Sequence, residues 1–181
     1  LLTEPVSAWT ERPWTEQHES EIQMYLQSRW KASSFDWLRY NESPQEDVQA
    51  IAAEVGIDFT KTTIGLLTNV VWDAQGCYPA NAFANMIEWV LETIRYFRDR
   101  PELQLLIRVH PAEVDPSVIR SNQPILAEID KVFRQLPENV FIIPPESRVS
   151  TYVAMSRCNA VLIYAIKTGV EMAARGIPVI A

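Results

Sequence analysis

Residues 160–181 read AVLIYAIKTGVEMAARGIPVIA and contain two short apolar runs separated by a segment with helical character. Residues 160–164 form a short apolar run typical of a buried strand. A helix is predicted over 169–174, with Gly176 as its stop, and a second apolar strand over 178–181. A strand, a helix and a strand in this order form a right-handed parallel crossover. The segment therefore predicts a parallel sheet covered by helices.

The same alternation extends back to residue 62. The expected order before residue 160 is strand 63–67, helix 80–98, strand 103–109, helix 125–136, strand 140–143 and helix 150–156. The strands are apolar on both faces, as expected where helices cover both sides of a sheet. The pattern predicts an α/β domain built on a doubly wound parallel sheet over residues 62–181.

Residues 1–61 are predicted to form a helical linker segment. One helix is expected over residues 15–31 and a second over 48–55, with Gly56 as its stop and a loop over 33–44 between them. The chain starts without Met and stops in an apolar strand, so we expect a fragment that lacks sequence on both sides, with the sheet domain truncated at its C-terminus.

Composition and net charge argue against several classes of function. The chain has 181 residues, 48% of them hydrophobic, and a net charge of −7, which argues against a nucleic-acid surface. Cys77 and Cys158 lie far apart and have no metal-ligand spacing, so no metal site is expected. No apolar run approaches the roughly 18 to 20 residues that span a bilayer, and no signal peptide precedes the first helix. We expect a cytoplasmic protein with reduced thiols.

Ligands of doubly wound sheets bind outside the carboxyl ends of the strands. Residues 68–76, after the first predicted strand, are polar and include Asn69, Trp72 and Asp73. One interpretation is a helix-entry loop in which Asp73 caps the backbone and Trp72 packs underneath. The other makes Asn69, Trp72 and Asp73 part of the wall of a sugar-binding cleft.

The second predicted strand turns polar at its end. Arg108 and His110 point to one face because strand side chains alternate, and Pro111 makes His110 the last strand residue. One interpretation is structural, with the histidine bound to a backbone carbonyl and the arginine extending to solvent. The interpretation we favour is that both side chains bind a nucleotide phosphate through charge-assisted hydrogen bonds.

The fourth predicted strand leads into Lys167, Thr168, Gly169 and Glu171. Thr168 and Glu171 have the spacing of a capping box. Gly169 would expose backbone amides at a helix N-terminus beside Lys167, which would create an anion site, and Glu171 could accept hydrogen bonds from ribose hydroxyls. The glycine-rich motifs of dinucleotide-binding and P-loop proteins are absent, so no cofactor is expected.

Three motifs together resemble the C-terminal half of capsule polysaccharide biosynthesis proteins. They are Thr68-Asn69-Val70-x-Trp72-Asp73, Arg108-x-His110-Pro111-x-Glu113 and Thr168-Gly169-x-Glu171-x-Ala173-x-x-Gly176-x-Pro178-Val179. These proteins look like glycosyltransferases with two Rossmann-like domains (the GT-B type), and their relatives include Kdo and sialic acid transferases. The resemblance covers roughly residues 62–181. It implies a Rossmann-like donor-nucleotide domain, and the His110-Pro111 pair is similar to the motif that holds the nucleotide of CMP-sugars.

The resemblance implies a transferase that moves a sugar from a CMP- or UDP-linked donor to a growing surface polysaccharide. His110, Lys167, Thr168 and Glu171 would contact the donor nucleotide, and His110 with Arg108 would neutralise the departing phosphate. A glycan or glycolipid acceptor would bind a second domain, so this fragment would be inactive alone. Peripheral contact with membrane export machinery at the inner membrane is a further implied partnership. The alternatives are a UDP-sugar epimerase of the same fold and a non-catalytic component of polysaccharide export.

Overall fold

The computed structural model describes residues 10–30, 43–73 and 82–181. The chain divides into two compact units, Leu1–Arg39 and Tyr40–Ala181. The described part of the first unit contains helix α2 (Glu16–Trp30), close to the helix predicted over 15–31. Within the described ranges, no helix is both long enough and apolar enough to cross a membrane.

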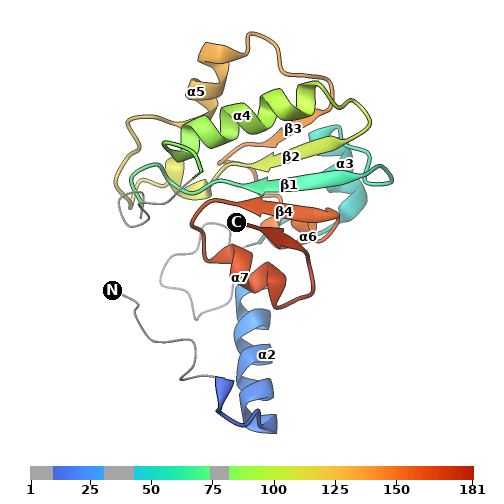
Figure 1. Cartoon of the computed structure of the whole chain (residues 1–181), viewed down its shortest axis with the longest axis vertical. Helices are drawn as coiled ribbons and strands as arrows, with labels where there is room; N and C mark the ends of the chain where they lie inside the picture. Colours follow the sequence, from blue (N-terminus) through green and yellow to red (C-terminus); the bar gives the residue numbers. More distant parts are fainter. Residues whose placement is uncertain (1–9, 31–42, 74–81) are drawn as a thin grey trace. The chain divides into compact units, whose positions relative to one another are not determined.

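The second unit is built on a five-stranded sheet in which every pairing is parallel. The strands run in the order β3-β2-β1-β4-β5, as Figure 1 shows. Their bounds are β1 Thr63–Leu67, β2 Gln104–Arg108, β3 Val140–Ile143, β4 Ala160–Ile163 and β5 Val179–Ile180. The predicted Rossmann-like fold class is therefore confirmed. The order of strands reverses between β1 and β4, and ligands of such sheets bind at this point.

Helices cover both faces of the sheet. They are α3 Val48–Val55, α4 Met86–Arg98, α5 Ile125–Val132, α6 Thr151–Met155 and α7 Thr168–Ala173. Trp89 and Ile94 of α4 and Ile129 of α5 share one core cluster with strand residues such as Leu66 and Ile107. Figure 1 shows α4 lying along the strands, with α3 and α6 partly hidden behind them.

Helix α3, in the predicted N-terminal segment, lies in the same compact unit as the sheet. It contacts α6 and β3, and the segment before it is tied to the loop before α6. The Gln45 N–H donates to the Arg148 carbonyl at 2.7 Å, and the Ser150 N–H donates to the Gln45 carbonyl at 2.9 Å. Asp47 caps the start of α3, and Gly56 ends it with a φ of 77°.

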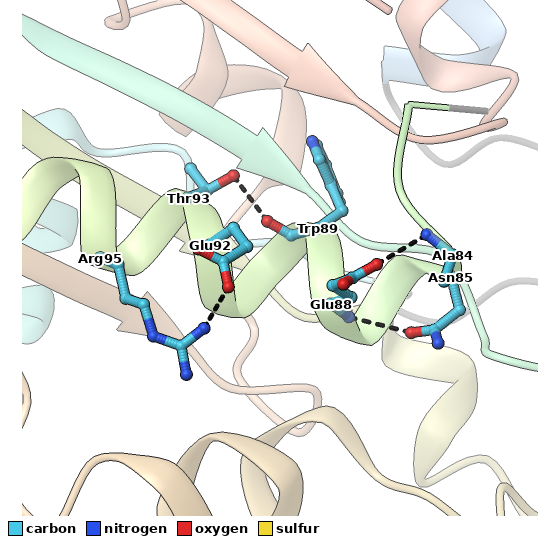
Figure 2. A network of polar contacts seen from close by, with 7 residues as sticks. All are labelled: Ala84, Asn85, Glu88, Trp89, Glu92, Thr93 and Arg95. Carbon is cyan, nitrogen blue, oxygen red and sulfur yellow. Dashed lines mark hydrogen bonds and ion pairs between the residues drawn. The ribbon is translucent and has the colours of Figure 1, made fainter.

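The start of α4 differs from the prediction of residue 80. The helix begins at Met86 because Asn85 is its cap: Asn85 Oδ1 accepts the Glu88 N–H at 2.9 Å, as Figure 2 shows. The Glu88 carboxylate accepts the Ala84 N–H at 2.6 Å, which satisfies a second amide before the first turn. Residues 80 and 81 lie outside the described residues.

Several other element ends also differ from the predictions, by one to four residues. Strand β2 ends at Arg108, and a short 3₁₀ turn over Pro111–Glu113 follows it. Helix α5 ends at Val132 because Phe133 has extended backbone angles, φ −113° and ψ 100°. Helix α7 begins at Thr168, one residue before its predicted start.

Candidate functional site

Asn69 joins the loops that follow β1 and β4, at the point where the strand order reverses. Its side-chain amide donates to Asp73 Oδ2 at 3.0 Å and to the Ala165 carbonyl at 3.2 Å. Its Oδ1 accepts the Val70 N–H at 2.8 Å, and Asn69 is only 5% exposed. Both donors of the amide are therefore bound to protein, so Asn69 positions the two loops.

His110 follows β2 and lies beside this link. Its Nδ1 accepts the Ala112 N–H at 3.1 Å, so the neutral ring carries its proton on Nε2. The pKa of His110 is lowered to about 4, first by burial and then by the charge of Arg108, while the Asp73 carboxylate acts in the opposite direction. At neutral pH His110 is thus an uncharged hydrogen-bond donor, where the sequence analysis expected a cationic group.

Asn69, Asp73 and His110 are the predicted site residues that the structure brings together. Asp73 is bound to Asn69 and lies within electrostatic range of His110. Trp72, in the same loop, is 45% exposed, so it is not packed underneath as the structural alternative required. Pro111 begins the 3₁₀ turn after His110 and shapes the backbone there. Residues 74–76 of the predicted polar loop lie outside the described residues.

The Arg108 side chain is bound elsewhere in the fold and does not join Asp73 and His110. The prediction that it contacts a phosphate is wrong. The side chain is almost completely buried, at 2% exposure. The guanidinium donates to the Pro144 carbonyl at 2.5 Å, the Ser147 carbonyl at 3.2 Å and the Thr151 hydroxyl at 3.2 Å. It therefore holds the loop between β3 and α6. Burial lowers the pKa of Arg108 to about 10, which leaves it charged at neutral pH.

Glu113, the last residue of the Arg108-x-His110-Pro111-x-Glu113 motif, also has a structural role. Both oxygens of its carboxylate accept the Ile125 N–H at 3.2 Å, at the start of α5. Burial raises the pKa of Glu113. The Arg108 and Glu113 side chains of this motif are therefore bound to protein groups.

The loop between β4 and α7 is closed by its own backbone. The amides of Gly169 and Val170 donate to the carbonyls of Ile166 and Lys167, at 3.2 and 3.0 Å. The prediction that backbone amides are exposed at the start of this helix is therefore wrong. A Cβ on Gly169 would lie 2.3 Å from Cδ1 of Ile163, so close packing on β4 explains the glycine.

The predicted capping box at α7 is also wrong. Lys167 is the cap residue, it makes no side-chain cap bond, and Thr168 lies inside the helix. Glu171 is buried at 2% exposure, and its Oε2 accepts the hydroxyl proton of Tyr152 at 2.5 Å. Lys167 is exposed in this loop.

Three residues outside the predicted site residues also shape the site. The Thr68 hydroxyl accepts the His110 N–H at 3.0 Å and so joins the ends of β1 and β2. Ala165 has a φ of 48°, a left-handed conformation that is rare for a residue with a side chain. Tyr152 contacts Glu171 from α6. Only Thr68, directly after a predicted strand, carried a signal in the sequence.

A hollow of about 410 Å³ lies at the opposite, amino-end edge of the sheet, lined in part by Gln104 and Asn139. The Gln104 amide donates to the Asp58 carbonyl and the Thr63 hydroxyl, at 2.7 and 2.9 Å. The Asn139 amide donates to the carbonyls of Phe97, in the last turn of α4, and of Arg100 and Leu103, between α4 and β2. These side chains serve the fold, so we do not assign a ligand to the hollow.

The described residues contain no group of three or more His, Cys, Asp or Glu side chains able to hold a metal ion. Cys77 lies outside the described residues. Cys158 is a free thiol, and burial raises its pKa to about 12, so it is protonated at neutral pH.

The lowered pKa of His110 predicts a specific loss of stability in acid. The unfolded chain has an ordinary imidazole pKa of about 6.5 and binds more protons than the folded chain below that pH. The contribution of His110 is therefore present above pH 6.5 and is lost as the pH falls toward about 4. We expect His110→Gln to flatten the decline of the unfolding free energy between these pH values, measured by urea denaturation.

The matched control for this experiment is His18→Gln, because the His18 residue of α2 is exposed. That variant should keep the decline of the parent chain. Equal slopes for the parent and His110→Gln would show that His110 does not titrate abnormally in the folded state.

Comparison with known proteins supports the fold. No family model matches the chain, and no curated protein matches it significantly. Among solved structures, the beta Kdo 2,4 transferase KpsC of Thermosulfurimonas dismutans is similar, with a TM-score of 0.59 at 14% sequence identity. The alignment covers 92% of this chain and 45% of KpsC, so the chain spans less than half of that protein. The likeness shows a Rossmann-like fold similar to that of a GT-B glycosyltransferase.

Proposed function

We propose that this chain is the donor-nucleotide-binding domain of a glycosyltransferase that transfers a sugar from a nucleotide-sugar to a capsular or surface polysaccharide. The observation that carries the proposal is the Asn69 link between the loops after β1 and β4, with His110 beside it. Polar groups are thus held in fixed positions where this fold binds ligands. The fold likeness to a Kdo transferase agrees with this assignment.

In this proposal His110 donates its Nε2 proton to a phosphate oxygen of the donor. The hydrogen bond strengthens as the nucleotide departs, because negative charge develops on the phosphate. Asp73 accepts hydrogen bonds from sugar hydroxyls, and Trp72 forms part of the sugar wall. Lys167 contributes a positive charge from the β4–α7 loop, together with the neighbouring Thr168.

The charges at this edge favour a donor with a single phosphate. His110 is neutral, the Arg108 guanidinium is bound to loop carbonyls, and Asp73 adds a negative charge. A CMP-sugar places one phosphate charge at this edge, whereas a UDP-sugar places two, and a second phosphate charge beside Asp73 is repelled. We therefore propose a CMP-linked donor. The likeness to a Kdo transferase, and not the charge, is the support for Kdo or another acid sugar as the transferred group. The acceptor, a glycan or a glycolipid, would bind outside this unit.

Calorimetric titration of the 181-residue chain with CMP and UDP tests the proposal. We expect CMP to bind more tightly than UDP. We expect His110→Ala to weaken CMP binding by roughly 10- to 100-fold, because a hydrogen bond to a charged group contributes about 1.5–3 kcal/mol.

The control is His18→Ala, which should bind CMP like the parent chain. A preference for UDP would support the epimerase alternative. Absence of binding to either nucleotide, or equal CMP affinity for the parent and His110→Ala, would contradict the proposed site.

A further inference from the structure

The loop between β4 and α7 is short, and packing fixes both of its ends. Tyr164, directly before the loop, is buried, and its ring lies 5.4 Å from the ring of Trp89 on α4, centroid to centroid. Gly169, directly after the loop, is buried so closely against Ile163 that a Cβ would overlap that side chain. Residues 165–168 therefore connect two fixed points, and the backbone angles of each residue decide where the next side chain lies.

Ala165 has the unusual backbone in this loop. Its φ is 48°, and the described residues hold no other non-glycine residue with a positive φ. Its side chain is exposed, so no packing of the methyl group compensates for the steric cost. The Asn69 amide donates to the Ala165 carbonyl at 3.2 Å and to Asp73 Oδ2 at 3.0 Å. A strained residue persists only where the surrounding structure determines it, and such residues cluster at functional sites.

Lys167 lies two residues further along the same loop. The Lys167 carbonyl accepts the Val170 N–H at 3.0 Å, and the Ile166 carbonyl accepts the Gly169 N–H at 3.2 Å. The side chain is exposed, and within the part of the chain that the structure describes no hydrogen bond or ion pair holds its ammonium group. The backbone, and not a side-chain partner, therefore sets the position of this positive charge.

We propose that Ala165 is a positioning residue, whose left-handed backbone holds the Lys167 ammonium where it binds the phosphate of the donor nucleotide. The inference rests on the proposed function, which places a nucleotide at the carboxyl ends of β1 and β4. Alanine has few backbone conformations to exchange with once Asn69 holds its carbonyl, whereas glycine has many. With a glycine at this position the loop would present Lys167 correctly for only part of the time, and the apparent affinity falls by that fraction.

The test is Ala165→Gly in the 181-residue chain, measured by urea denaturation and by calorimetric titration with CMP. Glycine adopts a positive φ without the steric cost that alanine carries, so the urea midpoint should not fall. CMP affinity should nevertheless fall by roughly 3- to 10-fold, because the binding conformation of the loop becomes one of several. A lower urea midpoint together with weaker binding would indicate a purely structural role and would overturn the inference.

A double-mutant cycle with Lys167→Met shows whether Ala165 acts through the lysine. Lys167→Met should itself weaken CMP binding, because the charged donor to the phosphate is removed. In that background Ala165→Gly should change the CMP affinity by less than about twofold. The same loss of affinity in both backgrounds would mean that Ala165 does not act through Lys167, and the inference would be incorrect.

The matched control is Ala174→Gly, the same change at an exposed position that follows α7 and has an ordinary right-handed φ of −62°. This variant should keep the CMP affinity of the parent chain. If Ala165→Gly also keeps it, the inference is overturned, while the proposed function, tested through His110, stays intact. If the parent chain does not bind CMP, the proposed function fails first and the inference falls with it.

Discussion

Arg108→Met is expected to destabilise the chain by roughly 3 kcal/mol or more, measured as the unfolding free energy in urea. The substitution fills much of the same volume but removes the donors that bind the carbonyls of Pro144 and Ser147 and the hydroxyl of Thr151. Each acceptor left unpaired in a buried setting costs about 1–3 kcal/mol, and the costs of neighbours are not fully additive. The loop between β3 and α6 should loosen first, because all three acceptors lie in it or at the start of α6.

Arg108→Lys separates geometry from charge in the same experiment. Lysine keeps the positive charge, but its single ammonium cannot reproduce the planar arrangement of guanidinium donors. We expect it to recover only part of the lost stability. If Arg108→Met were as stable as the parent chain yet lost CMP affinity, the guanidinium would bind the ligand after all, and the structural assignment would be incorrect.

The second large effect is expected for Gly169→Ala, with a loss of about 1–3 kcal/mol in the free energy of unfolding. The new Cβ would lie 2.3 Å from Cδ1 of Ile163 and 3.1 Å from its Cγ2. Ile163 belongs to β4 and is branched at Cβ, so it has few rotamers with which to move away. Helix α7 would be pushed away from the sheet.

A double-mutant cycle identifies the clashing atom. Ile163→Val removes Cδ1 and alone should cost about 0.5–1.5 kcal/mol. In its presence Gly169→Ala should cost clearly less than in the parent chain, since most of the overlap is gone. Strictly additive losses would mean that the glycine is required for another reason, such as close approach of a ligand to the backbone.

The sheet was predictable because its strands are short apolar runs with clear ends. Strands over 63–67 and 140–143 were predicted to the residue, since a turn or proline bounds each of them. The start of α4 was predicted incorrectly. Phe83 extends the apolar spacing toward the N-terminus, but the Asn85 cap makes Met86 the first helical residue. Periodicity measures which residues could face the core, whereas a cap decides where the backbone first becomes helical.

The site was predictable only in part, for a physical reason. Sequence alternation identified the polar positions Arg108 and His110 after an apolar strand, but it carries no information on what their partners are. The partners of Arg108 lie at Pro144, Ser147 and Thr151, and their approach depends on the packing of β3 beside β2. The partner of Glu171 depends likewise on how α6 and α7 lie against each other. Local patterns show where a polar group sits, while tertiary packing decides whether protein or ligand satisfies it.

The central place of β1 has a consequence for how the chain folds during synthesis. Ile64 pairs on one side with Leu105 and on the other with Ala160, so the second partner of β1 emerges from the ribosome long after β1 itself. Until then one edge of an apolar strand stays unpaired, and such an edge can pair with other chains. Pairings between residues this distant in sequence also slow folding. The nascent chain is therefore expected to expose an unpaired edge of β1 until β4 has been synthesised.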